Sequence, residues 1–597
     1  MNTYKSELNN LNLKNLLIRL LRLISYRRRK HLFLVLILTL LSSLSEIASI
    51  GAVLPFLGAL IEPDSIFNHH LANPILINLG ILDSNQLILF ITICFIAAII
   101  TSGLLRFILL SVKVRVSNAI GTEFSVLIFK KTIYQPYSVH ISRNSSQIIS
   151  GLVSKNSSVI DQTIMPLLNI VSSGLALIFI LIFLLTINST IAFAVFSFLG
   201  SFYVLIAFIA RRKVNDNSRF ISQDQNILVK TLQEGLGGVR DILINGTQDI
   251  YCDIYNKAES SLRRSHANIS LISSAPRYII ESVSICFIAI LACFISGRNN
   301  SLFAIPLLAT ITLGVQRVFP LLQEIYYSWI SISGNTSSLR DVLKLLEQSG
   351  SEYPDQSQHQ ANMQFKKTIE MQAVGFRYTK NAAWTLRGVN FKINKGTRLG
   401  IVGITGSGKS TFLDLIMGLL KPSEGSFMID GIVLNRKNMS AWRKHIAHVP
   451  QNIFLVDSSV AENIAFGIPK EKIDMERMQK AAMQAQISTT IESWSHQYET
   501  IVGERGIRLS GGQRQRIAIA RALYKGADVF IFDEATSALD SDTENLVMDA
   551  IENISKDVTI FLVAHRISTL KNCDLIFELV DGGINHVGKY SEMVLRK

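Results

Sequence analysis

The sequence predicts a polytopic α-helical membrane domain with long cytoplasmic extensions, followed by an α/β domain of the P-loop class. Three observations support this prediction. The 597 residues are 48% hydrophobic and only 17% charged, with a mean hydropathy of +0.32, which is high for a water-soluble chain of this size. Long apolar runs are confined to the first half. In the second half, short β-branched runs alternate with helical stretches, as in a parallel α/β sheet.

Six apolar runs are long enough to be membrane spans. They lie at about 31–61, 86–111, 165–187, 190–210, 278–297 and 302–330. Lysine and arginine concentrate on the cytoplasmic side of membrane proteins. Basic residues 27–30 precede the first span and residues 211–213 follow the fourth, whereas the predicted outside loop 62–85 contains no lysine or arginine. Both termini are therefore expected in the cytoplasm.

The cytoplasmic stretches 112–164 and 211–277 have helical patterning. Each is expected to form two helices of about 25 residues that project about 35–40 Å from the membrane at 1.5 Å per residue. Residues 347–368 are polar and contain a proline, which predicts a linker. The predicted organisation is a transmembrane domain at 1–346, this linker, and an α/β domain at 369–597.

The net charge of +14 is compatible with a nucleic-acid ligand or with a membrane protein that has a basic cytoplasmic face. The apolar spans favour membrane lipids as the surroundings and no nucleic acid as a partner. The five cysteines lie far apart and form no C-x-x-C pair. This spacing argues against a zinc site or a disulfide framework.

A phosphate-binding loop is predicted at 403–411, where GITGSGKST fits the pattern G-x-x-x-x-G-K-[ST] between a strand-like and a helical segment. Gly406 and Gly408 are expected to let backbone amides converge on phosphate oxygens at a helix start. Lys409 would bridge the β- and γ-phosphates of ATP, and the Ser410 hydroxyl would ligate Mg²⁺. The predicted ATP-contacting residues of the loop are Gly403, Thr405, Gly406, Ser407, Gly408, Lys409, Ser410 and Thr411.

An acidic pair is predicted to complete the nucleotide site. In DVFIFDEATSALD (528–540), residues 529–532 form a continuous apolar run, as expected for a strand buried on both faces of a parallel sheet. Asp533 at its carboxyl end is placed to hold the Mg²⁺ shell. Glu534 could polarise the attacking water. The α/β domain is thus predicted to be a P-loop ATPase domain.

Together with LSGGQ at 509–513, these motifs resemble the ATP-binding cassette family of transport ATPases. The resemblance covers the whole soluble half. It implies that the LSGGQ turn does not serve the phosphate loop of its own chain but faces the γ-phosphate held by Lys409 of a second copy. The chain is therefore expected to form a homodimer with two composite ATP sites. The residues of the turn are Ser510, Gly511, Gly512 and Gln513.

The resemblance implies roles for further residues of the soluble half. Tyr378 looks like the aromatic that stacks on adenine, the alternative being a tyrosine of the strand core. Gln451 looks like the glutamine that senses Mg²⁺ and the water while contacting the membrane arms, and His565 like the switch histidine at the γ-phosphate. Asp540 closes the SALD turn between subunits. Glu504 lies in the segment GERG (503–506), which resembles the loop that meets the intracellular arms in exporters.

Six spans before one cassette resemble the half-transporters of the exporter class, whose coupling helices would lie near 134–144 and 239–246. Segments of the membrane half look like bacterial flippases of lipid-linked oligosaccharides and exporters of envelope polysaccharides or glycolipids: 45–57, 135–149, 234–248 and 276–282. The implied function is ATP-driven export or flipping of a lipid-linked or amphiphilic substrate across the inner membrane. The alternatives are a multidrug or hydrophobic-compound exporter of the same fold and, more remotely, a non-transporting membrane ATPase or receptor.

Among the ionisable residues of the predicted spans, where charge is costly and often functional, three are candidates for contact with a substrate. Glu46 is near the middle of the first span, with Ser42 and Ser49 on the same face, and Arg106 and Arg317 are in the inner parts of the second and sixth. The hypothesis is that the arginines face a cavity and attract a pyrophosphate or another anionic headgroup. The alternative is that they reach the membrane surface or pair with acids such as Glu46 or Glu324.

Overall fold

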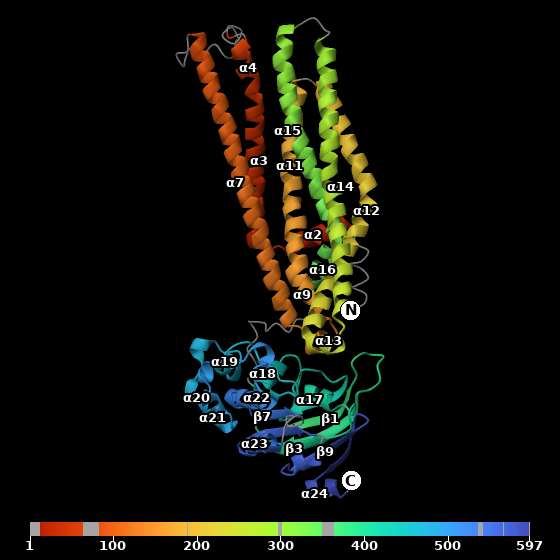
Figure 1. Cartoon of the computed structure of the whole chain (residues 1–597), viewed down its shortest axis with the longest axis vertical. Helices are drawn as coiled ribbons and strands as arrows, with labels where there is room; N and C mark the ends of the chain where they lie inside the picture. The colour runs from red at the N-terminus through yellow and green to blue at the C-terminus, as the bar shows by residue number, and fades with distance from the viewer. Residues whose placement is uncertain are drawn as a thin grey trace. The chain divides into compact units, whose positions relative to one another are not determined.

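The computed structural model describes residues 12–61, 63, 83–187, 189–296, 301–348, 363–534, 541–564 and 566–595. The chain forms two compact units, which Figure 1 shows as a bundle of long helices and a mixed α/β unit. The helical unit comprises Met1–Gln135 and Arg143–Ser351, and the α/β unit comprises Pro136–Ser142 and Glu352–Lys597. A short segment of the stretch 112–164, which was predicted to be cytoplasmic, therefore belongs to the same unit as the second half. Most of the predicted linker 347–368 lies outside the described residues.

The helical unit consists of long helices that pack along their lengths, with α7 beside α3, α12 beside α14, and α11 beside α15 (Figure 1). Its main elements are α2 (Leu13–Leu23), α3 (Tyr26–Gly51), α4 (Val53–Ile61), α7 (Ser84–Ile133), α9 (Ser145–Ser150), α10 (Asn156–Val159), α11 (Met165–Ile187), α12 (Ser189–Gly237), α13 (Val239–Asn245), α14 (Gln248–Ser296), α15 (Ser301–Gly334) and α16 (Thr336–Leu346). Two π-helical turns, η1 (Gly151–Lys155) and η2 (Ile160–Ile164), flank α10.

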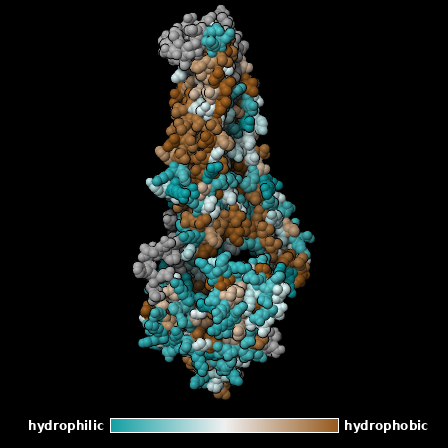
Figure 2. Space-filling view, turned by 90° about the vertical axis from the view of Figure 1, so that its left-hand side faces the viewer, coloured by the Kyte–Doolittle hydropathy of each residue, from teal (hydrophilic) through white to brown (hydrophobic). Residues whose placement is uncertain are grey.

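Among the described residues, three segments are long and apolar enough to cross a membrane, namely Tyr26–Leu60, Ser84–Ile133 and Ser145–Thr186. The other predicted spans lie within α12, α14 and α15. The predicted helical membrane fold is confirmed, whereas the count of six spans stays a prediction. Figure 2 shows hydrophobic residues over much of the surface of the helical unit, where side chains such as Phe107 and Phe208 are exposed. A surface of this kind is unfavourable in water and suits contact with lipid.

The stretches 112–164 and 211–277, predicted to be cytoplasmic arms, are helical and continuous with the apolar helices. α7 is a single helix of 50 residues, and α12 and α14 have 49 residues each. Each helix combines an apolar stretch with a polar one, because a change of composition does not break the backbone hydrogen bonds of a helix. Short helices do lie in the two stretches predicted for coupling helices: α8 (Tyr137–Ile141) and α13. The predicted loop 62–85 lies almost entirely outside the described residues.

Helix α2 is a feature that the sequence analysis did not predict. Its leucines Leu16 and Leu20 are fully buried, and they share a hydrophobic cluster with Leu339 and Leu343 of α16. The opposite face of α2 exposes Ile18 and Leu21. This amphipathic helix therefore links the start of the described chain to the end of the helical unit.

The α/β unit contains two sheets. A four-stranded antiparallel sheet has the order β2 (Leu386–Asn394), β1 (Thr368–Phe376), β4 (Glu424–Ile429), β5 (Ile432–Val433). A six-stranded sheet has the order β10 (Gly583–Gly588), β9 (Leu575–Val580), β3 (Arg398–Val402), β8 (Thr559–Val563), β7 (Val529–Asp533), β6 (Ile446–Val449). All neighbours in this second sheet are parallel except β10 and β9. Ligands of such sheets bind beyond the carboxyl ends of the parallel strands.

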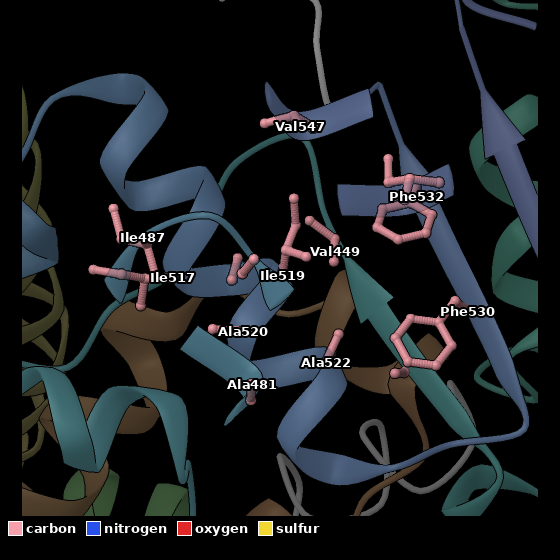
Figure 3. Packing of buried hydrophobic residues seen from close by; sticks show 14 of the residues in the cluster. Val449, Ala481, Ile487, Ile517, Ile519, Ala520, Ala522, Phe530, Phe532 and Val547 are labelled. Atoms are coloured by element: carbon pink, nitrogen blue, oxygen red, sulfur yellow. The ribbon is translucent and has the colours of Figure 1, made fainter. Parts of the chain in front are cut away.

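The helices of the α/β unit pack around this sheet and against one another. They are α17 (Lys409–Ile416), α18 (Met439–Lys444), α19 (Val460–Ile464), α20 (Met475–Gln484), α21 (Ser488–Glu492), α22 (Gly511–Lys525), α23 (Ser541–Glu552) and α24 (Tyr590–Val594). Figure 3 shows one buried cluster, in which Ile517 and Ile519 of α22 pack with residues of β6 and β7 such as Val449 and Phe532. The helix that follows the LSGGQ turn is thus anchored to the strand that ends in the acidic pair.

Candidate active site

The loop between β3 and α17 has a backbone that requires glycine. Gly406 and Gly408 have φ values of +87° and +97°, in the region that side chains with a Cβ rarely adopt. A Cβ at Gly408 would lie 2.9 Å from the Thr385 carbonyl oxygen, and one at Gly403 would lie 2.5 Å from the Leu579 carbonyl oxygen. The loop is therefore folded tightly against neighbouring backbone, with Thr405 and Gly406 exposed at its tip.

Lys409 lies over this loop. Its Nζ donates to the carbonyl oxygens of Gly403 at 2.8 Å and Ile404 at 3.1 Å, and the residue is 7% exposed. The ammonium charge and the first amides of α17 make this end of β3 electropositive. Ser410 is exposed, and the buried Ser407 hydroxyl has no hydrogen-bond partner among the described residues. These groups fit the phosphates of ATP and a Mg²⁺ ion, because they offer amides, an ammonium and unused hydroxyls together.

The acidic pair lies at the carboxyl end of β7, whose residues before Asp533 are all buried. Glu534 follows with a φ of +53°, a conformation that non-glycine residues adopt rarely and that is enriched at functional sites. Its carboxylate accepts a hydrogen bond of 2.5 Å from Nε2 of Gln451. Gln451 follows β6, which pairs directly with β7. The sheet register therefore brings together two of the predicted catalytic residues.

Asp414 is a residue of the site that the sequence analysis missed. It lies on α17, one turn beyond the phosphate loop, and burial together with the nearby charge of Asp533 raises the pKa of its carboxyl to about 6. The signal in the sequence was a single acid within the apolar run that follows the loop. An acid in that position adds negative charge to the side of the site where a metal ion is expected.

Tyr378 stands just after β1, where its hydroxyl is 3.0 Å from Thr411 Oγ1. Its ring packs edge-on against Phe376, with centroids 5.0 Å apart, and the residue is 50% exposed. It is therefore not a core residue, and half of its surface is accessible. Tyr137 of α8 lies near both Tyr378 and Asp414. Burial and the charges of Asp414 and Tyr378 raise the pKa of its phenol.

The LSGGQ turn forms the N-terminus of α22. Ser510 is the N-cap: its hydroxyl accepts from the Gln513 amide at 3.2 Å, and the Gln513 side chain accepts from the Ser510 amide at 2.9 Å. This reciprocal capping fixes the turn. The backbone N–H groups of Gly511 and Gly512 lie in the first turn of the helix, where no carbonyl of the helix accepts from them. They therefore remain available to an anion. Ser510 and Gly511 are exposed.

Three predicted residues give less information. His565 and Asp540 lie outside the described residues. Glu504 is exposed in a short 3-10 turn, η5 (Glu504–Gly506). No role of these residues follows from the geometry.

The three candidate substrate residues of the predicted spans meet in the helical unit. Oε1 of Glu46 on α3 is 3.8 Å from Nη1 of Arg106 on α7 and 4.0 Å from Nη1 of Arg317 on α15. The glutamate side chain is 8% exposed, whereas the arginine side chains are 40% and 42% exposed. The pairing with Glu46 that the sequence left as an alternative is thus observed. One carboxylate serves two guanidinium groups, so the cluster keeps a net positive charge.

A second polar cluster lies seven residues further along both α7 and α15. Lys113 Nζ donates to Asn169 Oδ1 at 2.9 Å and to Ser172 Oγ at 3.0 Å, and Asn169 Nδ2 donates to Glu324 Oε1 at 2.5 Å. These residues come from three helices, and Glu324, the other acid expected to pair with the arginines, instead accepts from Asn169. They tie α7, α11 and α15 together directly beyond the arginines.

Comparison with known proteins agrees with both halves of the chain. Residues 386–537 match the family model described as ABC transporter, and residues 32–301 match the ABC transporter transmembrane region. The ATP-dependent lipid A-core flippase of Saccharophagus degradans is 30% identical over 477 residues, which cover 79% of this chain and 78% of that protein. The protein of the same name from Pasteurella multocida is 29% identical over 472 residues, which cover 78% and 80%.

A solved structure supports the fold. The structure of a bacterial Atm1-family ABC exporter with ATP bound superposes with a TM-score of 0.75 and covers 95% of this chain and 96% of that chain. The sequence identity is 21%, so this similarity speaks for the fold alone.

Proposed function

The chain belongs to the ABC transporter family, and from this premise we propose that it is a homodimeric exporter that flips or exports an anionic, lipid-linked substrate across the cytoplasmic membrane. The predicted resemblance to this family is confirmed, and with it the coupling of ATP hydrolysis to transport. The substrate class, the homodimer, the Mg²⁺ ion and the orientation with both termini in the cytoplasm are parts of the proposal.

The hydrogen bond between Gln451 and Glu534 carries the assignment of the hydrolytic site. In this arrangement Glu534 accepts a proton from the attacking water, and Gln451 orients both the carboxylate and the water. Lys409 and the amides of the phosphate loop neutralise the phosphates. Ser410, Gln451 and Asp533 would hold Mg²⁺, which when bound neutralises charge on the β- and γ-phosphates. His565 is assigned to the γ-phosphate by the family resemblance.

The LSGGQ turn supports the dimer. A capped helix N-terminus with exposed amides is suited to a γ-phosphate, and the family resemblance assigns it to the ATP held by the other chain. ATP would then bind the closed dimer more tightly than the open one, and this difference shifts the population toward closure. Hydrolysis removes the γ-phosphate and returns the dimer to the open state.

The Glu46 cluster supports an anionic cargo. Two half-exposed guanidinium groups with a single carboxylate can still bind a phosphate or pyrophosphate. The relatives that are named lipid A-core flippases make a lipid with an acidic headgroup the best-supported class. A multidrug exporter would need no net charge at this position.

The test is flipping of a fluorescent polyprenyl-diphosphate-linked sugar in proteoliposomes. We expect ATP-dependent flipping that falls more than tenfold in Arg106→Gln/Arg317→Gln. The control Lys230→Gln/Arg263→Gln removes two exposed charges on the arms and should flip at the wild-type rate. Stimulation of ATP hydrolysis by diverse uncharged amphiphiles, with no response to the diphosphate lipid, would instead indicate the multidrug exporter.

A further inference from the structure

A cavity of about 860 Å³ in the helical unit has a strongly basic lining. The cavity lies among α2, α12, α15 and the start of α16. Trp329 and several hydroxyl and amide side chains also line it, and none of the lining residues is acidic. Its five basic residues are Lys14, Arg211, Arg212, Arg219 and Arg340.

The charges of this cavity are not neutralised within the described part of the chain, where none of the five basic residues forms an ion pair. The Nε of Arg340 is buried and has no hydrogen-bond partner there. Its neighbour Asp341 is already engaged, with Oδ2 2.6 Å from Lys155 Nζ and 2.8 Å from Ser222 Oγ. A buried guanidinium nitrogen without an acceptor is costly, so an external anion would stabilise this cavity.

Burial lowers the pKa of the Arg340 guanidinium, and the charge of Arg219 lowers it further, although Asp341 acts in the opposite direction. Arg219 and Arg340 therefore lie close enough to repel each other. Two like charges held together in this way favour a ligand that carries more than one negative charge.

The position of the cavity along α12 indicates a lipid rather than a soluble anion. The apolar run 190–210 ends directly before Arg211. Arg212 and Arg219 continue the helix face of Val204 and Phe208, at intervals of four, four and seven residues along the chain. These two apolar side chains are 69% and 76% exposed. A ligand with its acidic group in the cavity would thus have a hydrophobic stripe on the same helix face for its chains.

We propose that this cavity binds the phosphate-bearing headgroup of an anionic phospholipid from the cytoplasmic leaflet, with its acyl chains along the apolar stripe of α12. Guanidinium groups bind phosphate oxygens in a bidentate manner, and Trp329 suits the headgroup region of a bilayer. Five positive charges fit cardiolipin, whose headgroup has two phosphates. The site involves neither the nucleotide site nor the Glu46 cluster.

The test is cardiolipin binding to the detergent-purified full-length protein, measured by native mass spectrometry. Arg212 and Arg219 are exposed, so Arg212→Gln/Arg219→Gln should fold as the wild type does. Each basic residue near an anionic headgroup contributes about fivefold in affinity, so the dissociation constant should rise about 25-fold in this double variant. Lys230→Gln/Arg263→Gln, with the same change in charge, should bind cardiolipin as the wild type does.

Equal cardiolipin affinity in the wild type and Arg212→Gln/Arg219→Gln would overturn the proposal, as would an equal loss in both double variants. Inorganic pyrophosphate distinguishes a lipid from a soluble anion. It should displace cardiolipin poorly because it has no acyl chains, and complete displacement at equal concentration would refute the lipid assignment. The measurement reads lipid retention, so its outcome is independent of whether the protein flips a lipid.

Discussion

The substitution Glu534→Gln probes the hydrolytic site with little change in shape. The side chain keeps its length, and the amide can still meet Nε2 of Gln451, whose present contact with the carboxylate is 2.5 Å. The backbone keeps its φ of +53°, since glutamine and glutamate have the same preference for it. What is lost is the negative charge that accepts the proton of the attacking water.

The expected magnitude follows from the role of the carboxylate. A positioned general base contributes about 10²–10⁴-fold to a rate, which corresponds to roughly 3–5 kcal/mol in the activation free energy. ATP binding should be retained or tightened, because Lys409 and the loop amides that would contact the phosphates follow another strand, β3. The substitution also removes an acid near the expected position of the γ-phosphate.

Phosphate release at saturating ATP gives the rate, and retention of labelled ATP on the purified protein gives the binding. Glu471→Gln is a matched control, since Glu471 is exposed in the short turn η3 (Lys470–Lys472) and should leave both quantities unchanged. Hydrolysis by Glu534→Gln within tenfold of the wild-type rate would refute the assignment of Glu534 as the base.

Two further predictions concern the phosphate loop and the stability of the α/β unit. Gly408→Ala places a Cβ 2.9 Å from the Thr385 carbonyl oxygen at a φ of +97°, and ATP affinity should fall more than tenfold in an equilibrium binding measurement. Gly388→Ala is the control: its φ is also positive, at +59°, but the added Cβ meets nothing within 4 Å, so unchanged affinity is expected there and equal losses would contradict the argument. Burial lowers the pKa of His448 from 6.5 to about 4; between these values the unfolded state binds one more proton, so the free energy of unfolding should fall by up to about 3 kcal/mol as the pH is lowered through this window. His448→Gln should weaken this acid sensitivity in thermal midpoints of the detergent-purified protein, and an identical pH profile in both proteins would exclude His448 as its source.

The nucleotide site could be predicted from sequence because its parts are local. The loop before Lys409, the strand before Asp533 and the cap at Ser510 each depend on residues within one turn or one strand. What the sequence could not give is the register of β6 on β7, which sets the contact between Gln451 and Glu534. Strand pairing across such a separation is decided by the whole sheet.

The membrane half was predictable in its apolar runs but not in its polar contacts. Hydropathy locates a run such as 190–210, yet it does not reveal that α12 continues unbroken for 49 residues. The sharing of Glu46 by two arginines depends on how three helices pack. Helix α2 was missed because the segment 13–23 is short and mixes leucines with basic residues. The burial of its leucines depends on α16, which is distant in the sequence.

The composite ATP site is tested most directly by mixing two inactive chains. Lys409→Ala disables the phosphate loop, and Gly512→Asp places a negative charge in the LSGGQ turn, so each homodimer should fail to hydrolyse ATP. In the mixed dimer, the intact loop of one chain would meet the intact turn of the other. We predict that differently tagged, co-purified mixed dimers regain hydrolysis and trap one nucleotide per dimer. Mixed dimers as inactive as the two parents would contradict a site shared between chains.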